Sequence, residues 1–285
     1  MQQNDPIMLI ADSGSTKTDW LLTDTCGNTL LTIATQGINP VHQTEEQIAD
    51  ILRQVATKLS ESPSSVCFYG AGVLLQNQQV MFSLLKASFH EADYVCAESD
   101  LLGAARSLCG STEGVACILG TGANSCLYDG CSIVQNTPPL GYILGDEGSG
   151  AVLGRRLLNA LYKGALPARL REEFEIGTQL TLADIITKVY RQPMANRFLA
   201  SLCPFIHEHL SCQPLREMVV DEFRRFFRMN VAPYEREDLP VSFVGSVATY
   251  FASELGEAAA AEGFCLGRVV RSPMSGLVAF HTDAK

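Results

Sequence analysis

The stretch that decides the fold is Ile10-Ala-Asp-Ser-Gly-Ser-Thr-Lys-Thr-Asp-Trp-Leu-Leu-Thr-Asp24. Its apolar ends belong to two short strands that we expect at 7–11 and 19–23, and the small polar residues between them predict a tight hairpin turn. Backbone N–H groups and hydroxyls in such a turn can bind an anion. We therefore expect Asp12 to hold a Mg²⁺ ion that bridges phosphates. The phosphates themselves would be held by the turn residues Ser13, Gly14, Ser15, Thr16 and Lys17, although an exposed turn lysine explains Lys17 equally well.

A second stretch repeats this layout. Gly114-Val-Ala-Cys-Ile-Leu-Gly-Thr-Gly-Ala-Asn-Ser-Cys-Leu-Tyr128 places the turn Gly120-Thr121-Gly122 between two apolar runs. Either stretch alone is as well explained by an ordinary glycine-rich hairpin. The pair favours two related lobes that close on one nucleotide, and the restart of the pattern places their boundary near residue 112.

The remaining pattern completes a sheet in each lobe. Thr44 and Gln47 have the spacing of a capping box and predict the start of a helix. Further strands are expected at 29–35, 66–69, 94–97, 131–135, 241–244 and 268–270. Residues 165–235 are expected to be mostly helical. The fold class is therefore α/β, with a mixed five-stranded sheet and helices in each lobe.

The composition is typical of a globular protein with a sizeable core. The 285 residues are 47% hydrophobic and 18% charged, and no apolar run approaches the roughly 18 residues of a membrane span. The N-terminus lacks the pattern of a signal peptide. The ten cysteines include no Cys-x-x-Cys pair, which favours reduced thiols and a cytoplasmic location.

The charge is uneven along the chain. Residues 1–150 hold 5 Lys and Arg against 16 Asp and Glu, whereas the remainder is nearly balanced, and the net charge is −10. An acidic first half argues against nucleic acid and against anionic membranes as partners. It does not argue against a nucleotide, because local N–H groups and Mg²⁺ can outweigh a distant field.

Four motifs together resemble the N-acetylglucosamine kinase family. They are Ala11-Asp-Ser-Gly-Ser-Thr-Lys-Thr18, Gly120-Thr-Gly-Ala-Asn124, Gly141-Tyr-Ile-Leu-Gly-Asp-Glu-Gly-Ser-Gly150 and Gly245-Ser-Val-Ala248. This family is related to the activator ATPases of benzoyl-CoA reductase, within the actin/hexokinase superfamily. The resemblance implies two ribonuclease H-like lobes around a central cleft, which would sandwich ATP and a sugar. The lobes would be residues 1–112 and 113–285, the second with a helical insertion at about 165–235.

The resemblance also implies a catalytic base at Asp100, which is expected between a strand and a helix. From the sequence alone, a helix cap explains Asp100 at least as well. The expected sugar contacts are Asn39, Asp100, Thr121, Asn124 and Asp146. Asp146 could instead lie in the first turn of the next helix, and a role for Glu147 is open. Gly245 and Ser246 are expected near the adenosine, or else form only a tight strand–helix turn.

These residues favour an ATP-dependent sugar kinase that acts on an amino sugar, with N-acetylglucosamine at O6 as the first expectation. The alternative is an activator-type ATPase that couples hydrolysis to a partner protein. Such relatives hold an iron–sulfur cluster through cysteines, and Cys126 and Cys131 show no cluster motif. A catalytically silent sugar sensor is a third reading. The sequence does not determine the oligomeric state, and a homodimer is a possibility only because it is the commonest closed oligomer.

Overall fold

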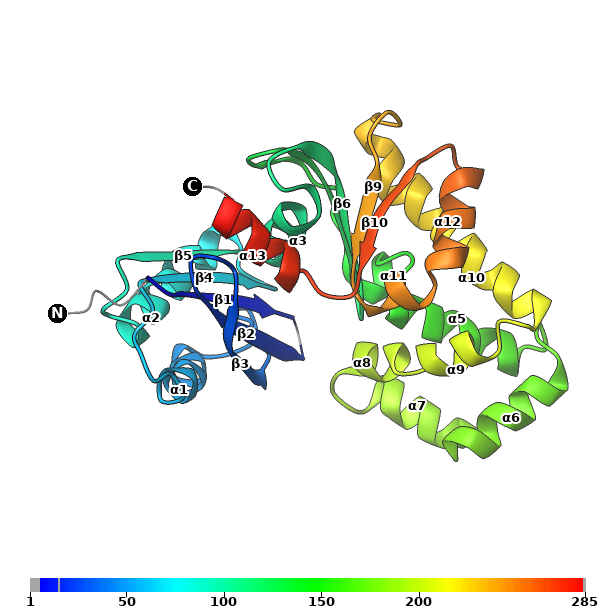
Figure 1. Ribbon diagram of the computed structural model, residues 1–285. Coiled ribbons are helices and arrows are strands. Elements are labelled where there is room, and N and C mark those ends of the chain that lie inside the picture. The colour runs from blue at the N-terminus through cyan, green and yellow to red at the C-terminus, as the bar shows by residue number, and fades with distance from the viewer. Residues whose placement is uncertain (1–5, 15, 284–285) are drawn as a thin grey trace. The chain divides into compact units, whose positions relative to one another are not determined.

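The computed structural model describes residues 6–14 and 16–283, which form two compact units (Figure 1). The first unit contains the chain up to residue 112, with 130–132 and the segment from 273 onward. The second contains 113–129 and 133–272. The sequence predicted a single lobe for everything after residue 112, whereas the structure groups the last helix with the first unit. Ser15, an expected phosphate contact, lies outside the described residues.

The first unit is built on a five-stranded mixed sheet in the order β3-β2-β1-β4-β5. The strands β1, β2 and β3 form an antiparallel meander, and β4 and β5 continue the sheet parallel to β1. This confirms the expected fold class. The strand bounds are β1 Met8–Ser13, β2 Lys17–Thr23, β3 Thr29–Gln36, β4 Ser65–Gly70 and β5 Tyr94–Ser99.

Helices pack on both faces of this sheet because the buried residues of β1 alternate. Leu9 and Ala11 join the core beneath α1 (Glu45–Ala56) and α2 (Leu75–Ser88), whereas Ile10 packs with Leu277 on the opposite face. Leu277 belongs to α13 (Met274–Asp283), which packs against α3 (Asp100–Cys109). The capping box of Thr44 and Gln47 is present at the start of α1, as predicted.

The second unit repeats the topology in the order β10-β9-β6-β7-β8. Here β6 pairs with β7 antiparallel and with β9 parallel. The strand bounds are β6 Glu113–Leu119, β7 Ala123–Asp129, β8 Ile133–Gln135, β9 Val241–Val244 and β10 Leu266–Val270.

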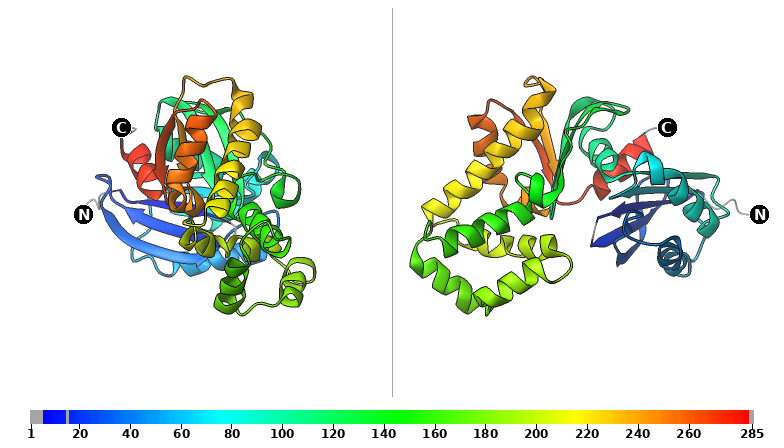
Figure 2. Two further views of the ribbon diagram at one scale, coloured as in Figure 1. Left: turned by 90° about the vertical axis from the view of Figure 1, so that its right-hand side faces the viewer. Right: turned by 180° about the vertical axis from the view of Figure 1, so that it is seen from behind.

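The expected helical segment of the second unit is also present. Pro204 and Pro214 lie in the first turns of their helices, where the missing N–H has no intrahelical partner to lose. Figure 2 shows α6 to α9 grouped beyond one end of the strands. The bounds are α4 Gly141–Leu144, α5 Gly150–Tyr162, α6 Ala168–Thr178, α7 Leu182–Tyr190, α8 Ala195–Ala200, α9 Cys203–Glu208, α10 Gln213–Phe226, a π-helix Phe227–Val231, a 3-10 helix Ala232–Tyr234, α11 Ser246–Tyr250 and α12 Ala252–Ala261.

Within residues 6–14 and 16–283, none of the helices combines the length and the apolar character that a membrane crossing requires.

Candidate functional site

The expected residues of the first unit gather where three parallel strands end. Ser13 at the end of β1 pairs with Gly70 of β4, and Gly70 pairs with Ser99 of β5. Asp12 and Asp100 therefore lie at the same edge of the sheet. In α/β sheets, ligands commonly bind at the carboxyl ends of parallel strands.

Asp100 is the first residue of α3, and its carboxyl is half-buried. The hydroxyl of Ser99 accepts the N–H of Leu102, so Ser99 is the N-cap, and the reading of Asp100 as the cap is wrong. Asp100 Oδ1 accepts the Leu101 N–H at 2.9 Å. Burial raises the pKa of Asp100 to about 6, although the Leu101 N–H opposes this shift. A carboxylate with this pKa can take a proton near neutral pH.

Asp12 is a second half-buried carboxylate at this edge. Burial raises its pKa to about 7, and the neighbouring Asp100 and Asp19 raise it further against the opposing effect of Lys17. Lys17 Nζ lies 2.6 Å from Asp19 Oδ1 in an exposed ion pair. Lys17 is therefore already paired with a carboxylate of its own hairpin.

The carboxylates near Asp12 suit a magnesium ion that takes most of its ligands from water and phosphate and only one or two from the protein. Two carboxylates that repel each other at one edge would be stabilised by a divalent cation. Among the described residues, no group of three or more His, Cys, Asp or Glu side chains converges on one point. Mg²⁺ commonly binds through one or two carboxylates, with water and phosphate oxygens as the remaining ligands.

Hydrogen bonds connect the first hairpin to the loop that carries Asn39. The buried Ser13 hydroxyl lies 2.7 Å from Thr18 Oγ1, donates to Ile38 O and accepts the Ile38 N–H. Gly14 N donates to Lys17 O and closes the turn. The Ser13 hydroxyl and the Gly14 N–H are therefore both used within the protein. Gly37 N donates to Thr16 O, and the Thr16 side chain is exposed.

Asn39 lies beside the segment that follows β4. Its Oδ1 accepts the Val41 N–H at 2.9 Å. A Cβ at Gly72, where φ is +77°, would lie 2.1 Å from Asn39 Oδ1, so only glycine fits this close approach. The expected sugar contact Asn39 and the first hairpin are thus connected within the first unit.

In the second unit, hydrogen bonds connect the turn 120–122 to the start of α5. Gly120 N donates to Gly122 O, while Gly120 O and Thr121 O accept the N–H groups of Gly150 and Ala151. These contacts fix the conformation of the expected phosphate turn. They also use N–H groups of α5 that could otherwise bind an anion.

Gly245 lies against the same turn because β6 and β9 are parallel and end together. Its φ is +131°, and a Cβ there would lie 2.1 Å from the carbonyl oxygen of Leu119. The position therefore requires glycine, and Ser246 begins α11 directly after it. The contact with Leu119 is enough to explain why this residue is glycine, so no ligand is needed for that explanation. The same contact places the backbone of Gly245 at the edge of the sheet.

Asp146 lies beside the second hairpin turn. Its carboxylate accepts the Ala123 N–H, and a Cβ at Gly122 would lie 3.2 Å from Asp146 Oδ2. Burial raises the pKa of Asp146 to about 6, against the effect of the Ala123 N–H, and Glu147 raises it further. The helix α5 begins later, with Ser149 as its N-cap. The reading of Asp146 as a first-turn residue is therefore wrong.

Asn124 is held next to this group. Its Oδ1 accepts the Ser125 N–H and the side-chain N–H of Asn136, each at 2.9 Å. The expected residues of the second unit therefore lie together around the turn 120–122.

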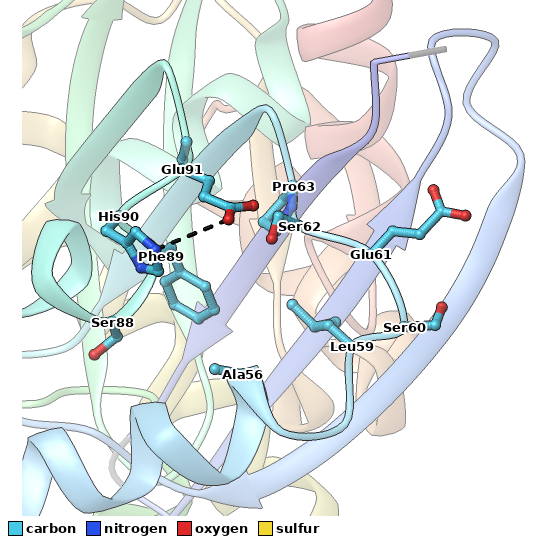
Figure 3. A pocket seen from close by; sticks show the side chains of 11 residues that line it. Ala56, Leu59, Ser60, Glu61, Ser62, Pro63, Ser88, Phe89, His90 and Glu91 are labelled. Carbon is cyan, nitrogen blue, oxygen red and sulfur yellow. Dashed lines mark ion pairs between the residues drawn. The ribbon is translucent and has the colours of Figure 1, made fainter. Parts of the chain in front are cut away.

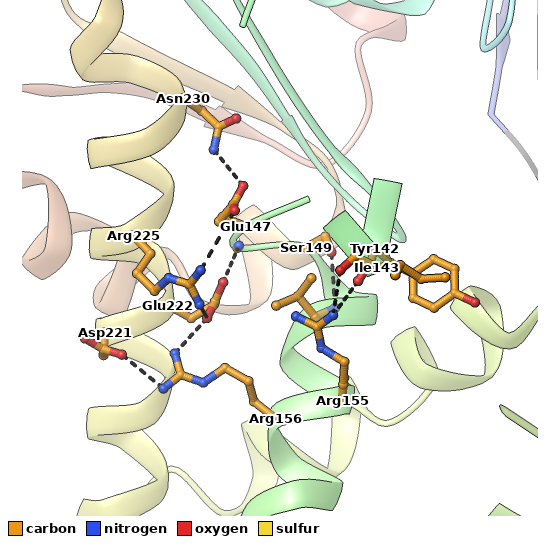
Figure 4. A network of polar contacts seen from close by, with 12 residues as sticks. Tyr142, Ile143, Glu147, Ser149, Arg155, Arg156, Asp221, Glu222, Arg225 and Asn230 are labelled. Carbon is orange, nitrogen blue, oxygen red and sulfur yellow. Dashed lines mark hydrogen bonds and ion pairs between the residues drawn. The ribbon is translucent and has the colours of Figure 1, made fainter. Parts of the chain in front are cut away.

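A set of charged and polar residues that was not predicted from the sequence contacts the loop at Glu147 and Gly148 (Figure 4). The buried Glu222 on α10 accepts the Gly148 N–H and pairs with Arg156 of α5, and Asn230 contacts Glu147. A signal was present in the sequence. Glu222 stands among apolar residues at helical spacing, where a carboxylate needs a specific partner.

A surface hollow of about 200 Å³ lies elsewhere on the first unit, between the end of α1 and the segment that joins α2 to β5 (Figure 3). His90 Nε2 lies 3.9 Å from Glu91 Oε1 at its edge. Its lining contains none of the expected site residues.

The two sheets have equivalent strand orders, with a meander followed by two parallel strands. A crystal structure from Porphyromonas gingivalis, described as a putative N-acetylglucosamine kinase, is 45% identical with a TM-score of 0.93. The match covers 97% of this chain and 99% of that chain. The chain therefore belongs to the N-acetylglucosamine kinase family of the actin/hexokinase superfamily.

More distant structures share the fold. A structure from Chromobacterium violaceum, also described as a putative N-acetylglucosamine kinase, is 18% identical with a TM-score of 0.74, over 97% of this chain and 99% of that one. A ROK hexokinase from Thermus thermophilus is 16% identical with a TM-score of 0.54, over 98% and 99%. Neither a protein-family model nor a curated protein matches the chain.

Proposed function

We propose that this protein is an ATP-dependent kinase that transfers the γ-phosphate of ATP to O6 of N-acetylglucosamine. Membership of the family supports this function. The observation that carries it is the carboxyl of Asp100, which lies at the carboxyl end of β5 with a pKa of about 6. Its geometry and its pKa suit a group that accepts the proton of a sugar hydroxyl.

The roles of the other residues follow from what a phosphoryl transfer requires. The protein must hold the nucleotide, place one hydroxyl in line with the γ-phosphate, and stabilise the charge that develops. In the first unit, Asn39 and Asp100 would contact the sugar, and Thr16 and Lys17 would contact phosphate. The Gly14 N–H is used within the turn, so Gly14 would fix the conformation of the turn. The Ser13 hydroxyl is used internally, so its contribution would be to shape the turn.

The second unit would contribute in the same manner. Thr121, Asn124 and Asp146 would contact the sugar, and the turn from Gly120 to Gly122 would approach phosphate. Gly245 and Ser246 would approach the adenosine. Asp12 would hold Mg²⁺ together with water and phosphate oxygens. The bound metal would neutralise phosphate charge during transfer.

The test is a coupled ADP-release assay with Mg-ATP and a panel of N-acetylglucosamine, glucosamine and N-acetylmuramic acid. We expect the highest kcat/KM with N-acetylglucosamine, and a product in which the NMR coupling of phosphorus to the C6 protons identifies a 6-phosphate. The substrate assignment is refuted if another sugar is preferred. If no sugar stimulates ADP release, the kinase assignment fails, and sugar-independent hydrolysis would favour the partner-coupled ATPase.

A further inference from the structure

A carboxylate to which the proposed reaction assigns no role is buried in the second unit. Glu222 is 0% exposed on the apolar face of α10. Its Oε2 accepts a hydrogen bond from Arg156 at 2.7 Å, and Arg225 lies 3.6 Å away. Burying a carboxylate is costly unless its oxygens are paired, and this one meets that requirement with two arginines and a backbone N–H.

That N–H belongs to Gly148, which donates to Glu222 Oε1 at 3.2 Å. Gly148 lies two residues after Asp146, in the loop 145–149. The same loop has a second anchor, because Asn230 donates to Glu147 Oε2 at 3.2 Å and Arg225 lies 3.9 Å from Glu147 Oε1. Figure 4 shows both anchors reaching the loop from α10 and from the π-helix that follows it.

These anchors separate two consecutive carboxylates. Glu147 is held toward Asn230, whereas the Asp146 carboxylate is held by the Ala123 N–H at the start of β7. Asp146 has a φ of +54°, a left-handed conformation that an aspartate adopts only at a cost. Such a conformation persists where surrounding contacts hold it in place.

Asn230 is itself fixed to the strand that carries Asn124. Its carbonyl oxygen accepts the hydroxyls of Ser125 and Thr137, at 3.1 and 3.0 Å. It lies in a π-helix, a form that often occurs at functional sites. The network thus connects the loop of Asp146, the start of β7 and α10.

We propose that Glu222, supported by Arg156 and Asn230, is a positioning residue that holds the loop 145–149 so that Asp146 can bind the sugar. This inference rests on the proposed function, because Asp146 is a sugar contact only if the protein is a sugar kinase. Glu222 itself touches neither substrate nor nucleotide in this proposal. The competing explanation is that Glu222 and Arg156 only stabilise the packing of α10 on α5.

The chain offers a matched control for that explanation. Glu254 on α12 is 6% exposed, and its Oε1 lies 3.4 Å from Arg216 on α10. It is therefore a second buried Glu–Arg pair between α10 and a neighbouring helix. A purely structural role predicts similar consequences for the two glutamates.

The test compares kinetics and loop exchange in four variants: Glu222→Gln, Glu222→Ala, Glu254→Gln and Glu254→Ala. Glu222→Gln retains an oxygen for the Gly148 N–H but loses the charge. We expect kcat/KM for N-acetylglucosamine to fall about tenfold in Glu222→Gln and about a hundredfold in Glu222→Ala, because small misplacements of positioning groups have effects of this size. The KM for ATP, and all constants of the Glu254 variants, should stay within about twofold.

Hydrogen–deuterium exchange of the peptide that contains 145–149 provides a readout that needs no sugar. We expect faster exchange in both Glu222 variants and an unchanged rate in both Glu254 variants. Equal exchange, or equal kinetic losses at the two glutamates, would overturn the positioning role. If the wild-type protein phosphorylates no sugar but the exchange result holds, the proposed function has failed while the restraint on the loop stands. If Glu222→Ala does not fold, Glu222→Gln still decides between the two explanations.

Discussion

The substitution Asp100→Asn should make the free protein more stable while it removes the proposed catalytic base. The carboxyl of Asp100 has a pKa of about 6 instead of its ordinary 3.8, because partial loss of water disfavours the charged form and only backbone N–H groups oppose this effect. A pKa difference of this size corresponds to about 3 kcal/mol of ionisation cost in the folded state. Water at the half-buried side chain reduces the figure, so we expect about 1.5 to 3 kcal/mol.

The sign of the pH dependence follows from the direction of this shift. Because the folded-state pKa is raised, the ionisation of Asp100 costs nothing below pH 3.8, where the carboxyl is protonated in the folded and the unfolded state. The free energy of unfolding of the wild-type protein then falls as the pH rises through 6. The advantage of Asp100→Asn should therefore be largest near pH 8 and should shrink as the pH falls through 6. The asparagine oxygen can still accept the Leu101 N–H, so the start of α3 should be retained.

Chemical denaturation of both proteins, without nucleotide or Mg²⁺, measures this difference at pH 8, 6.5 and 5. The exposed Asp50 on α1 supplies a matched control, since Asp50→Asn should change stability little at any of these values. The reasoning is refuted if Asp100→Asn is less stable than the wild-type protein at pH 8, or if the difference does not vary with pH.

Three further predictions follow. Gly245→Ala should lower the free energy of unfolding by about 3 kcal/mol or more, because its Cβ would meet Leu119 O at 2.1 Å with φ at +131°. The control Gly177→Ala, on α6 with open space around it, should raise stability by about 0.5–1 kcal/mol in the same thermal melt. Asp12→Asn should raise the Mg²⁺ concentration that gives half-maximal activity, and an unchanged titration would remove Asp12 from the metal site. Thr44→Ala should cost about 1 kcal/mol by denaturant titration, since the Thr44 hydroxyl accepts the N–H of the third helical residue; no loss would show that the capping box contributes nothing.

Local pattern was enough to predict much of the fold. The polar turn at 13–18 and its copy at 120–122 predicted two hairpins. In the structure, each hairpin belongs to a three-stranded meander that is followed by two parallel strands, which complete a sheet. The spacing of Thr44 and Gln47 predicted a helix start that the structure confirms. These features depend on residues close together in the chain, for which local geometry determines the outcome.

A local sequence pattern could not predict contacts between segments that are far apart in the chain. The helix α13 packs on α3 because Gly276 allows close approach to Ser107, a contact between segments more than 160 residues apart. Glu222 meets Gly148 across 74 residues. The hydroxyl of the neighbouring Ser99 caps α3, although the sequence had also allowed Asp100 as the cap. In each case a partner from elsewhere, or a competing neighbour, decided the role of the residue.

The most direct test of the proposed function is ADP release by the wild-type protein and by Asp100→Asn, with Mg-ATP and N-acetylglucosamine, together with a nucleotide-binding titration of both. We predict sugar-dependent ADP release that the substitution lowers by about a thousandfold or more, which is the upper part of the range for a lost general base. Nucleotide affinity should be retained. Near-normal turnover in Asp100→Asn, or the absence of sugar-dependent release in the wild-type protein, would contradict the account.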